Sequence, residues 1–215
     1  MRSVLEFCLQ EKQIQFNPLA SLKLSCEYEG NPDSFELDDI IKLKEIPSHF
    51  LTIEQNQVRD IFLFMIGSGM DHCDYIRRKD SWLYRDDDRY WVKYTRQKTM
   101  TYLCPKGKKA DSLLLPDAVE IFLKYEGSLS LMPNCTLNVM NNEIKQIYKI
   151  AKIRRPDLEK ISSKLAIKTY ANLYSNYMNL SDESLAYMMG HTTTKHLKKY
   201  RNFHKRRVMN ELKKK

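Results

Sequence analysis

Apolar residues recur every three or four positions along most of the chain, a spacing typical of helices that bury one face. The clearest of these helices should begin at a capping box formed by Thr52 and Gln55 and run to about Ile66, before the break at 67–69. Its buried face should comprise Val58, Ile61, Phe62 and Met65. Other helices are expected at Val4–Gln13, 37–46, Asp71–Arg78, Asp117–Tyr125, Leu137–Ile150, Ser163–Tyr177, Asp182–Met189, Thr193–Tyr200 and from about His204.

Between Lys79 and Pro116 the pattern changes to alternation, which favours strands. Apolar and polar residues alternate on both sides of the acidic turn 86–88, as expected for an antiparallel hairpin. A third strand is predicted at either Thr101–Cys104 or Ser112–Leu115, with a basic loop at Lys106–Lys109 between the two. The fold class is therefore α+β, mainly α: a helical bundle with a small three-stranded antiparallel sheet.

The first 34 residues have a different character from the rest. A short helical pattern ends at Asn17-Pro18, and the stretch Ser25–Ser34 contains Gly, Asn and Pro and resembles a linker. We therefore expect two parts, residues 1–34 and residues 35–215, with the second part forming the main domain. Because the sequence starts within a helical pattern, we expect further protein to precede it.

Charge points to a polyanionic partner. The formal net charge is +9, and ten Lys or Arg lie between Lys195 and Lys215 against the single acid Glu211. Five scattered cysteines without a CxxC pair favour neither a disulfide framework nor a zinc site. No apolar run is long enough to cross a bilayer, and no signal peptide is recognised near the start. We expect a cytoplasmic protein that uses neither a metal nor another cofactor.

The stretch Leu185–Tyr200 (LAYMMGHTTTKHLKKY) combines several unusual residue types at fixed spacing. Gly190 follows a short helical run, His191 comes directly after it, and Tyr200 lies nine positions further on. Taken alone, these residues are also compatible with an ordinary capped helix and a packed tyrosine. Other parts of the chain make a functional interpretation stronger.

The order of elements and several motifs resemble the catalytic domain of tyrosine recombinases (the phage integrase family), especially integrases of the Bacteroides conjugative-transposon type. The resemblance extends from about Val4 to the C-terminus, and residues 1–34 would correspond to the end of a core-binding domain and its linker. The His-to-Tyr spacing is its most specific feature. The motifs are VRDIFLFMIGSGMDHCDY (58–75), RQKT (96–99), LLLPDAVEIFLKY (113–125), KLAIKTYANLY (164–174) and MGHTTTKHLKKY (189–200).

The resemblance implies that the chain breaks and rejoins DNA strands through a 3′-phosphotyrosyl intermediate, which needs no metal because the covalent link conserves the bond energy. Tyr200 would be the nucleophile and Lys98 the acid that protonates the leaving oxygen. His191 and Lys164 would support the phosphate. Double-stranded DNA would be the substrate, and a homotetramer on DNA the working assembly, in integration, excision or inversion in a bacterial, nucleoid-associated setting.

Three positions depart from the family pattern, and one of them is Lys164, which stands where the family has a histidine. Asp71 and Ile167 stand where that family has its two arginines, and arginines that clamp a transferring phosphoryl group contribute on the order of 10³ to 10⁵ in rate. The sequence therefore favours a recombinase whose activity is impaired, and the alternatives are an inactive DNA-binding module of the same fold and an unrelated basic helical DNA binder. In each case DNA should be contacted by Lys106, Lys108, Lys109, Lys168, Lys195, Lys198, Lys199 and Arg201.

Two geometric expectations follow from the resemblance. Lys98, Lys164, His191 and Tyr200 should surround one basic cleft with Asp71 in its wall. Asp71 and Lys164 should form an ion pair, because each would otherwise be left as a partly buried, unpaired charge.

Overall fold

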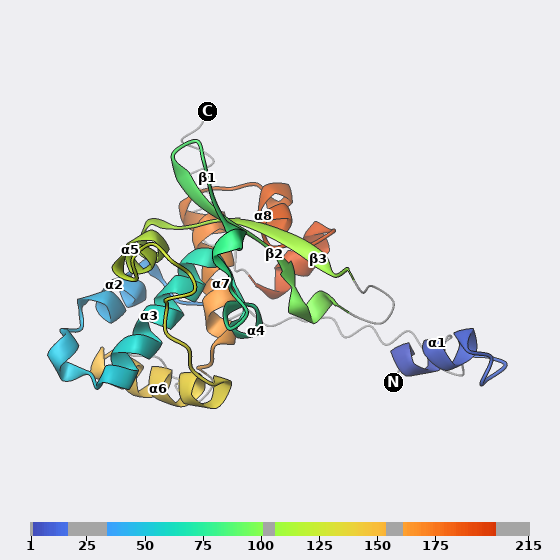
Figure 1. Ribbon diagram of the computed structural model, residues 1–215, viewed down its shortest axis with the longest axis horizontal. Helices are drawn as coiled ribbons and strands as arrows, with labels where there is room; N and C mark the ends of the chain where they lie inside the picture. The colour runs from blue at the N-terminus through green and yellow to red at the C-terminus, as the bar shows by residue number, and fades with distance from the viewer. Residues whose placement is uncertain (1, 17–33, 101–105, 154–160, 201–215) are drawn as a thin grey trace. The chain divides into compact units, whose positions relative to one another are not determined.

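The computed structural model describes residues 2–16, 34–100, 106–153 and 161–200 (Figure 1). The chain divides into two compact units, residues 1–30 and 31–215. Within the first unit, the structure describes one helix, α1 (Arg2–Gln10), where a helical segment was predicted. Arg201 and the basic helix expected from about His204 lie outside the described residues.

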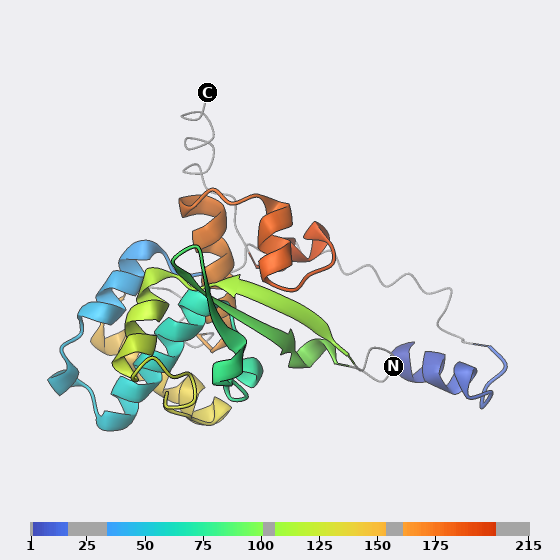
Figure 2. The ribbon, with the colours of Figure 1, turned by 45° about the horizontal axis from the view of Figure 1, so that its top comes forward.

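The second unit is built around α3 (Ile53–Ser68). Every residue from Val58 to Ser68 is buried, so this part of the helix is enclosed on all sides and does not bury only the one face predicted from its spacing. Helices α5, α6 and α7 pack against it, as Figures 1 and 2 show. The other helices of the unit are α2 (Leu37–Glu45), α4 (His72–Tyr75), α5 (Pro116–Lys124), α6 (Leu137–Ile150), α7 (Lys164–Asn172) and α8 (Asp182–Met188).

Both ends of α3 follow from local chemistry. The predicted capping box is confirmed: the Thr52 hydroxyl accepts from the Gln55 amide at 3.1 Å, and the Gln55 side chain accepts from the Thr52 amide at 3.1 Å. Gly69 ends the helix with a φ of 69°, a left-handed conformation that suits glycine. A Cβ at this position would lie 2.8 Å from the ring of Tyr170, so a larger residue would also collide with α7.

The sheet has the strand order β1-β2-β3 and is antiparallel throughout, as predicted. Strand β1 (Leu83–Asp86) and strand β2 (Arg89–Arg96) are joined at Asp87-Asp88, whose φ values of 48° and 59° are typical of a tight hairpin turn.

Strand β3 (Lys108–Leu113) begins earlier than the predicted Ser112–Leu115. Lys108 and Lys109 therefore lie on a strand and not in a basic loop, since the long β2 offers backbone groups that these residues pair with. The other candidate for the third strand, Thr101–Cys104, lies outside the described residues.

Three predicted helices of the second unit differ most from the observed structure, and the other helix boundaries described in that unit shift by at most two residues. The helix expected at Asp71–Arg78 stops at Tyr75, because the Arg78 guanidinium turns inward and donates to the carbonyl of Leu129 at 2.6 Å and to the Asn134 side chain at 2.6 Å. The helix expected at Ser163–Tyr177 continues beyond α7 as a π turn, Leu173–Tyr177. The segment expected as a helix at Thr193–Tyr200 is a 3₁₀ segment, Thr194–Lys199.

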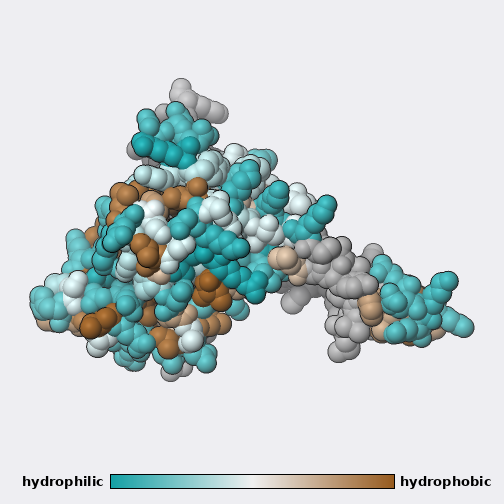
Figure 3. Space-filling view, viewed as in Figure 1, coloured by the Kyte–Doolittle hydropathy of each residue, from teal (hydrophilic) through white to brown (hydrophobic). Residues whose placement is uncertain are grey.

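The surface of the second unit is mixed. Hydrophobic and hydrophilic residues are interspersed over the face seen in Figure 3. Phe50, Ile53 and Leu123 are among the large apolar residues that remain exposed. Scattered exposure of this kind is normal for a folded domain and identifies no binding surface by itself.

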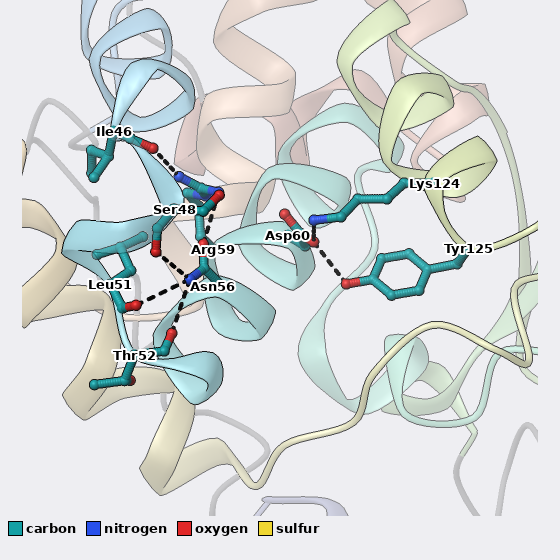
Figure 4. Close-up of polar contacts among 9 residues, drawn as sticks. All are labelled: Ile46, Ser48, Leu51, Thr52, Asn56, Arg59, Asp60, Lys124 and Tyr125. Atoms are coloured by element: carbon teal, nitrogen blue, oxygen red, sulfur yellow. Dashed lines mark hydrogen bonds and ion pairs between the residues drawn. The ribbon is translucent and has the colours of Figure 1, made fainter.

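Two neighbouring charged residues of α3 are buried and satisfied by separate networks (Figure 4). Arg59 donates to the carbonyl of Ile46 at 2.5 Å and to the side chain of Asn56 at 3.0 Å, which ties α3 to the segment after α2. Asp60 accepts from Lys124 at 2.6 Å and from the Tyr125 hydroxyl at 2.7 Å, which ties α3 to the end of α5. Buried charges are tolerated when they are paired in this way.

Asp60→Ala should destabilise the domain by about 1–3 kcal/mol, because a half-buried hydroxyl and an ammonium group lose their buried acceptor. Urea unfolding at pH 7 would measure the change. Lys44→Ala is a matched control: Lys44 is paired with Asp117 and Glu120 on the surface, and loss of such pairs costs about 0–1 kcal/mol. Equal losses in the two variants would contradict a special role for the Asp60 network.

Candidate functional site

Lys98 lies in a 3₁₀ turn, Gln97–Thr99, that directly follows β2. The Thr99 hydroxyl donates to the Arg96 carbonyl at 2.7 Å and accepts from the Lys108 amide at 2.7 Å. These bonds fix the backbone of the turn against β3. The Lys98 side chain extends from this fixed turn and is 53% exposed.

Two acids of the α4 region hold this turn. The Asp74 carboxylate, on α4, accepts from the Gln97 amide at 2.7 Å. Asp71, which precedes α4, forms an ion pair with Lys98 through Oδ2. The predicted ion pair between Asp71 and Lys164 is therefore wrong. The turn after β2 brings a lysine from 27 positions away to the acid, and a contact of this kind depends on the tertiary fold.

Burial by itself lowers the pKa of Lys98, but the hydrogen bond and the charge of Asp71 outweigh it, so the pKa lies above its usual range. Tyr200 is close enough to contribute to the same upward shift. Lys98, Asp71 and Tyr200 therefore share one electrostatic environment, although Tyr200 is about one hundred positions from Lys98 in the sequence.

His191 is presented by the turn that ends α8. Gly190 has a φ of 66°, and the His191 amide donates to the Ala186 carbonyl at 2.8 Å, a typical glycine-based helix end. The imidazole lies beside the Tyr200 ring, with centroids 5.4 Å apart and planes at 32°. The two residues that lie nine positions apart in the sequence therefore have their rings in direct contact.

Helix α7 places the remaining predicted residues. Lys164 is its exposed first residue, and within the described part of the chain its side chain makes no hydrogen bond or ion pair. Ile167 is 4% exposed and belongs to the hydrophobic core, whereas Lys168 is half-buried. The described residues form two contacting pairs, Lys98 with Asp71 and His191 with Tyr200, and the charge of Tyr200 acts on the pKa of Lys98. No described contact joins Lys164 to either pair.

One of the predicted DNA-contacting lysines touches the segment that carries His191. Lys108 donates to the Thr192 hydroxyl at 3.2 Å, next to His191. Lys106, Lys109 and Lys195 are exposed. For Lys198 and Lys199 the structure describes the backbone alone, and both lie in the 3₁₀ segment that leads to Tyr200.

The alternation of β2 contained a signal for a further residue. Val92, Tyr94 and Arg96 point to the same side of the strand, and all three are buried, with Arg96 only 5% exposed. Period-2 spacing from Val92 could therefore have identified Arg96 as a buried cation next to Lys98. Its guanidinium donates to the Met189 carbonyl at 2.8 Å, just before Gly190.

The described residues contain neither a group of metal ligands nor a helix suited to a membrane. No group of three or more His, Cys, Asp or Glu side chains there is arranged to hold a metal ion. No helix in that part of the chain has the length and apolar content required to cross a membrane.

The fold is similar to that of solved recombinase and integrase structures. No protein-family model and no curated protein matches the sequence. Among solved structures, the chain is similar to the XerH site-specific recombinase in a post-cleavage complex with a palindromic difH substrate, with a TM-score of 0.61 and 14% identity. The match covers 84% of this chain and 52% of XerH, so the chain spans about half the length of that protein.

Two further structures agree with this result. The Tn1549 transposon integrase in complex with a circular intermediate DNA has a TM-score of 0.61 at 11% identity, covering 100% of this chain and 76% of the integrase. A lambda integrase fragment, a dimer bound to a COC′ core site, has a TM-score of 0.58 at 15% identity, covering 94% and 70%. The fold is therefore that of the tyrosine recombinase catalytic domain, and the predicted fold class is confirmed.

Asp71→Asn should lower the pKa of Lys98, because the amide cannot replace the carboxylate charge that raises it. Side-chain NMR titration of Lys98 would measure this. A raised lysine pKa stabilises the folded state below its unfolded value of 10.5, and this contribution is lost as pH rises through the folded pKa. The variant should therefore lose less stability over that alkaline range. Asp86→Asn, at the distant hairpin tip, is the control, and an unchanged Lys98 pKa in Asp71→Asn would contradict the pairing.

Proposed function

We propose that this chain is a site-specific recombinase or integrase domain that breaks and rejoins DNA strands through a 3′-phosphotyrosyl intermediate. The observation that carries the proposal is the ring contact between His191 and Tyr200 beside the Lys98 turn, within a tyrosine recombinase fold. The similar structures of XerH, the Tn1549 integrase and lambda integrase are complexes with DNA, which supports duplex DNA as the substrate.

The residues divide the reaction between them. The Tyr200 hydroxyl attacks a phosphodiester, forms the phosphotyrosyl bond and displaces the 5′ oxygen, which receives a proton from Lys98. His191, next to the phenol, accepts its proton or donates to a phosphate oxygen. Lys164 is proposed as a further phosphate contact, from the exposed start of α7. Attack by a 5′ hydroxyl on the phosphotyrosyl bond reverses the sequence and rejoins the strand.

The activity is proposed to be impaired. Asp71 occupies a position where the family has an arginine. Its ion pair with Lys98 compensates the lysine charge and raises the lysine pKa, which makes Lys98 a weaker acid toward the leaving group. Ile167 supplies no cation, and its burial leaves the phosphate without an arginine from α7. A DNA-binding module without chemistry is the outcome if no covalent product forms.

The wider context of the domain is also inferred. We expect a relative of the integrases of the Bacteroides type, encoded by a mobile element and acting at the bacterial nucleoid in the cytoplasm. Assembly on DNA is proposed to be oligomeric, up to a tetramer. The dimeric complex of lambda integrase is consistent with assembly on DNA and sets no subunit number here.

A nicked suicide DNA substrate should trap a slow covalent adduct at Tyr200, and Tyr200→Phe should abolish it. The double change Asp71→Arg with Ile167→Arg should raise the adduct rate about 10³-fold, because it restores both phosphate clamps. Denaturing gel electrophoresis would measure the product, and thermal unfolding would verify that the double variant folds. The impairment proposal fails if the unmodified protein already reacts as fast as a folded double variant. The absence of any Tyr200 adduct in both proteins would contradict the proposal that the chain breaks and rejoins DNA strands.

DNA affinity should fall by orders of magnitude between about 50 and 200 mM salt and depend little on sequence, because clustered lysines displace counterions from phosphates. Gel shifts with random duplex would measure this. Lys108→Ala and Lys109→Ala together should reduce the slope of log affinity against log salt concentration by roughly two units, since two phosphate contacts are lost. A slope unchanged from that of the unmodified chain would exclude these lysines as phosphate contacts.

A further inference from the structure

Arg96 has no role in the proposed reaction, yet it combines three unusual features. Its side chain is 5% exposed, although it carries a permanent charge. Within the described part of the chain it has no carboxylate at ion-pair distance, and its hydrogen bond to the Met189 carbonyl spans 93 positions. Removing a guanidinium from water in this way is costly, so a structural or functional gain must offset it.

The first half of the arrangement concerns the His191 turn. Arg96 Nη1 donates to the Met189 carbonyl at 2.8 Å, at the end of α8. The next residue, Gly190, is packed so closely that a Cβ there would lie 2.7 Å from the Lys109 carbonyl oxygen and 3.2 Å from Arg96 Cδ. The Arg96 side chain therefore lies directly against the backbone that presents His191 and leads to Tyr200.

The second half concerns the Lys98 turn. Arg96 is the last residue of β2, and its carbonyl accepts the Thr99 hydroxyl at 2.7 Å, which closes the turn around Lys98. Its side chain and its own backbone thus contact the two segments that carry the proposed catalytic groups.

Asp74 adds an electrostatic link between Arg96 and the Lys98 turn. It is 2% exposed and accepts from the Gln97 amide through Oδ1, while Oδ2 has no hydrogen-bond partner within the described residues. Burial raises the pKa of this carboxyl, and the Gln97 amide and the Arg96 charge oppose that rise. Arg96 therefore also makes it less costly to keep a carboxylate beneath the Lys98 turn.

We propose that Arg96 is a positioning residue that holds the Lys98 turn and the His191–Tyr200 segment in one fixed frame. The inference rests on the proposed function for its consequence, since the groups held in register are the leaving-group acid and the nucleophile. Its structural part, the coupling of the two turns, stands independently of whether the chain performs catalysis.

The variants Arg96→Met and Arg96→Lys separate position from charge. Methionine retains the apolar stem and removes the hydrogen bond to Met189. Lysine retains the charge but has a single rotating ammonium in place of a planar fork. A residue that acts by position should fail in both variants, whereas one that acts by charge should be largely rescued by lysine. Lys93→Met, on the same strand with its side chain 56% exposed, is the matched control for loss of one charge.

The first measurement needs no activity. Amide hydrogen exchange of the full chain should accelerate at least about tenfold at Gly190 and His191 and in the turn 97–99 in both Arg96 variants. Amides of α3 should be unaffected, because the core helix does not depend on this contact, and Lys93→Met should exchange like the unmodified chain. Uniform acceleration that includes α3 would show simple destabilisation and overturn the proposal, as would unchanged exchange at Gly190.

The second measurement uses the suicide substrate in two forms, with oxygen or with sulfur as the bridging 5′ leaving atom. Displacement of a 5′ thiolate needs no proton, so it removes the requirement for Lys98. Arg96→Met and Arg96→Lys should slow adduct formation about 10- to 100-fold with oxygen, as expected for misplaced catalytic groups, and the loss should be smaller with sulfur. Full rescue by lysine, or equal losses with both substrates, would overturn the coupling to the Lys98 turn.

The two measurements distinguish the two hypotheses. If the unmodified chain forms no Tyr200 adduct with either substrate, the proposed function fails and the exchange data alone decide the role of Arg96. If the adduct forms and the exchange pattern stays unchanged in Arg96→Met, the enzyme stands and the positioning role is excluded.

Discussion

The burial of α3 from Val58 to Ser68 is the constraint on which the rest of the domain depends. A helical segment without a solvent-facing side must be surrounded by other elements, and α5, α6 and α7 provide that cover. Its two buried charges must also find partners, which Arg59 does in the segment after α2 and Asp60 does at the end of α5. Packing and polar satisfaction therefore fix the same neighbours. The glycine that ends α3 then fixes the start of the segment that carries Asp71.

The candidate site is assembled where three chain segments meet: the start of α4, the end of β2 and the end of α8. Two polar contacts that involve backbone tie these segments together: Gln97 to Asp74, and Arg96 to Met189. Backbone contacts hold position more tightly than long exposed side chains can, because fewer rotatable bonds intervene. A lysine and a tyrosine far apart in the sequence can therefore share one environment with little local freedom.

The two unusual positions are compatible with the fold for different reasons. Ile167 is an apolar residue in an apolar core, so it leaves no unsatisfied polar group there. Asp71 has a lysine beside it, so its charge is compensated. Both residues are therefore compatible with a fold that is shared at 11–15% identity with solved structures of recombinases bound to DNA. Fold is maintained by the pattern of burial, whereas chemistry depends on single side chains.

Local sequence determined the features that depend on neighbouring residues: the helices and their periodicity, the capping box at Thr52, the glycine stop at Gly190 and the hairpin. The spacing of His191 and Tyr200 in the sequence also identified these two residues as candidates for the site. Only the tertiary structure decided that α3 is enclosed, that Lys108 and Lys109 lie on a strand, and that Asp71 pairs with Lys98 and not with Lys164. The physical reason is range: caps and periodicity act over a few residues, whereas partner choice depends on which distant segments packing brings within a few ångströms.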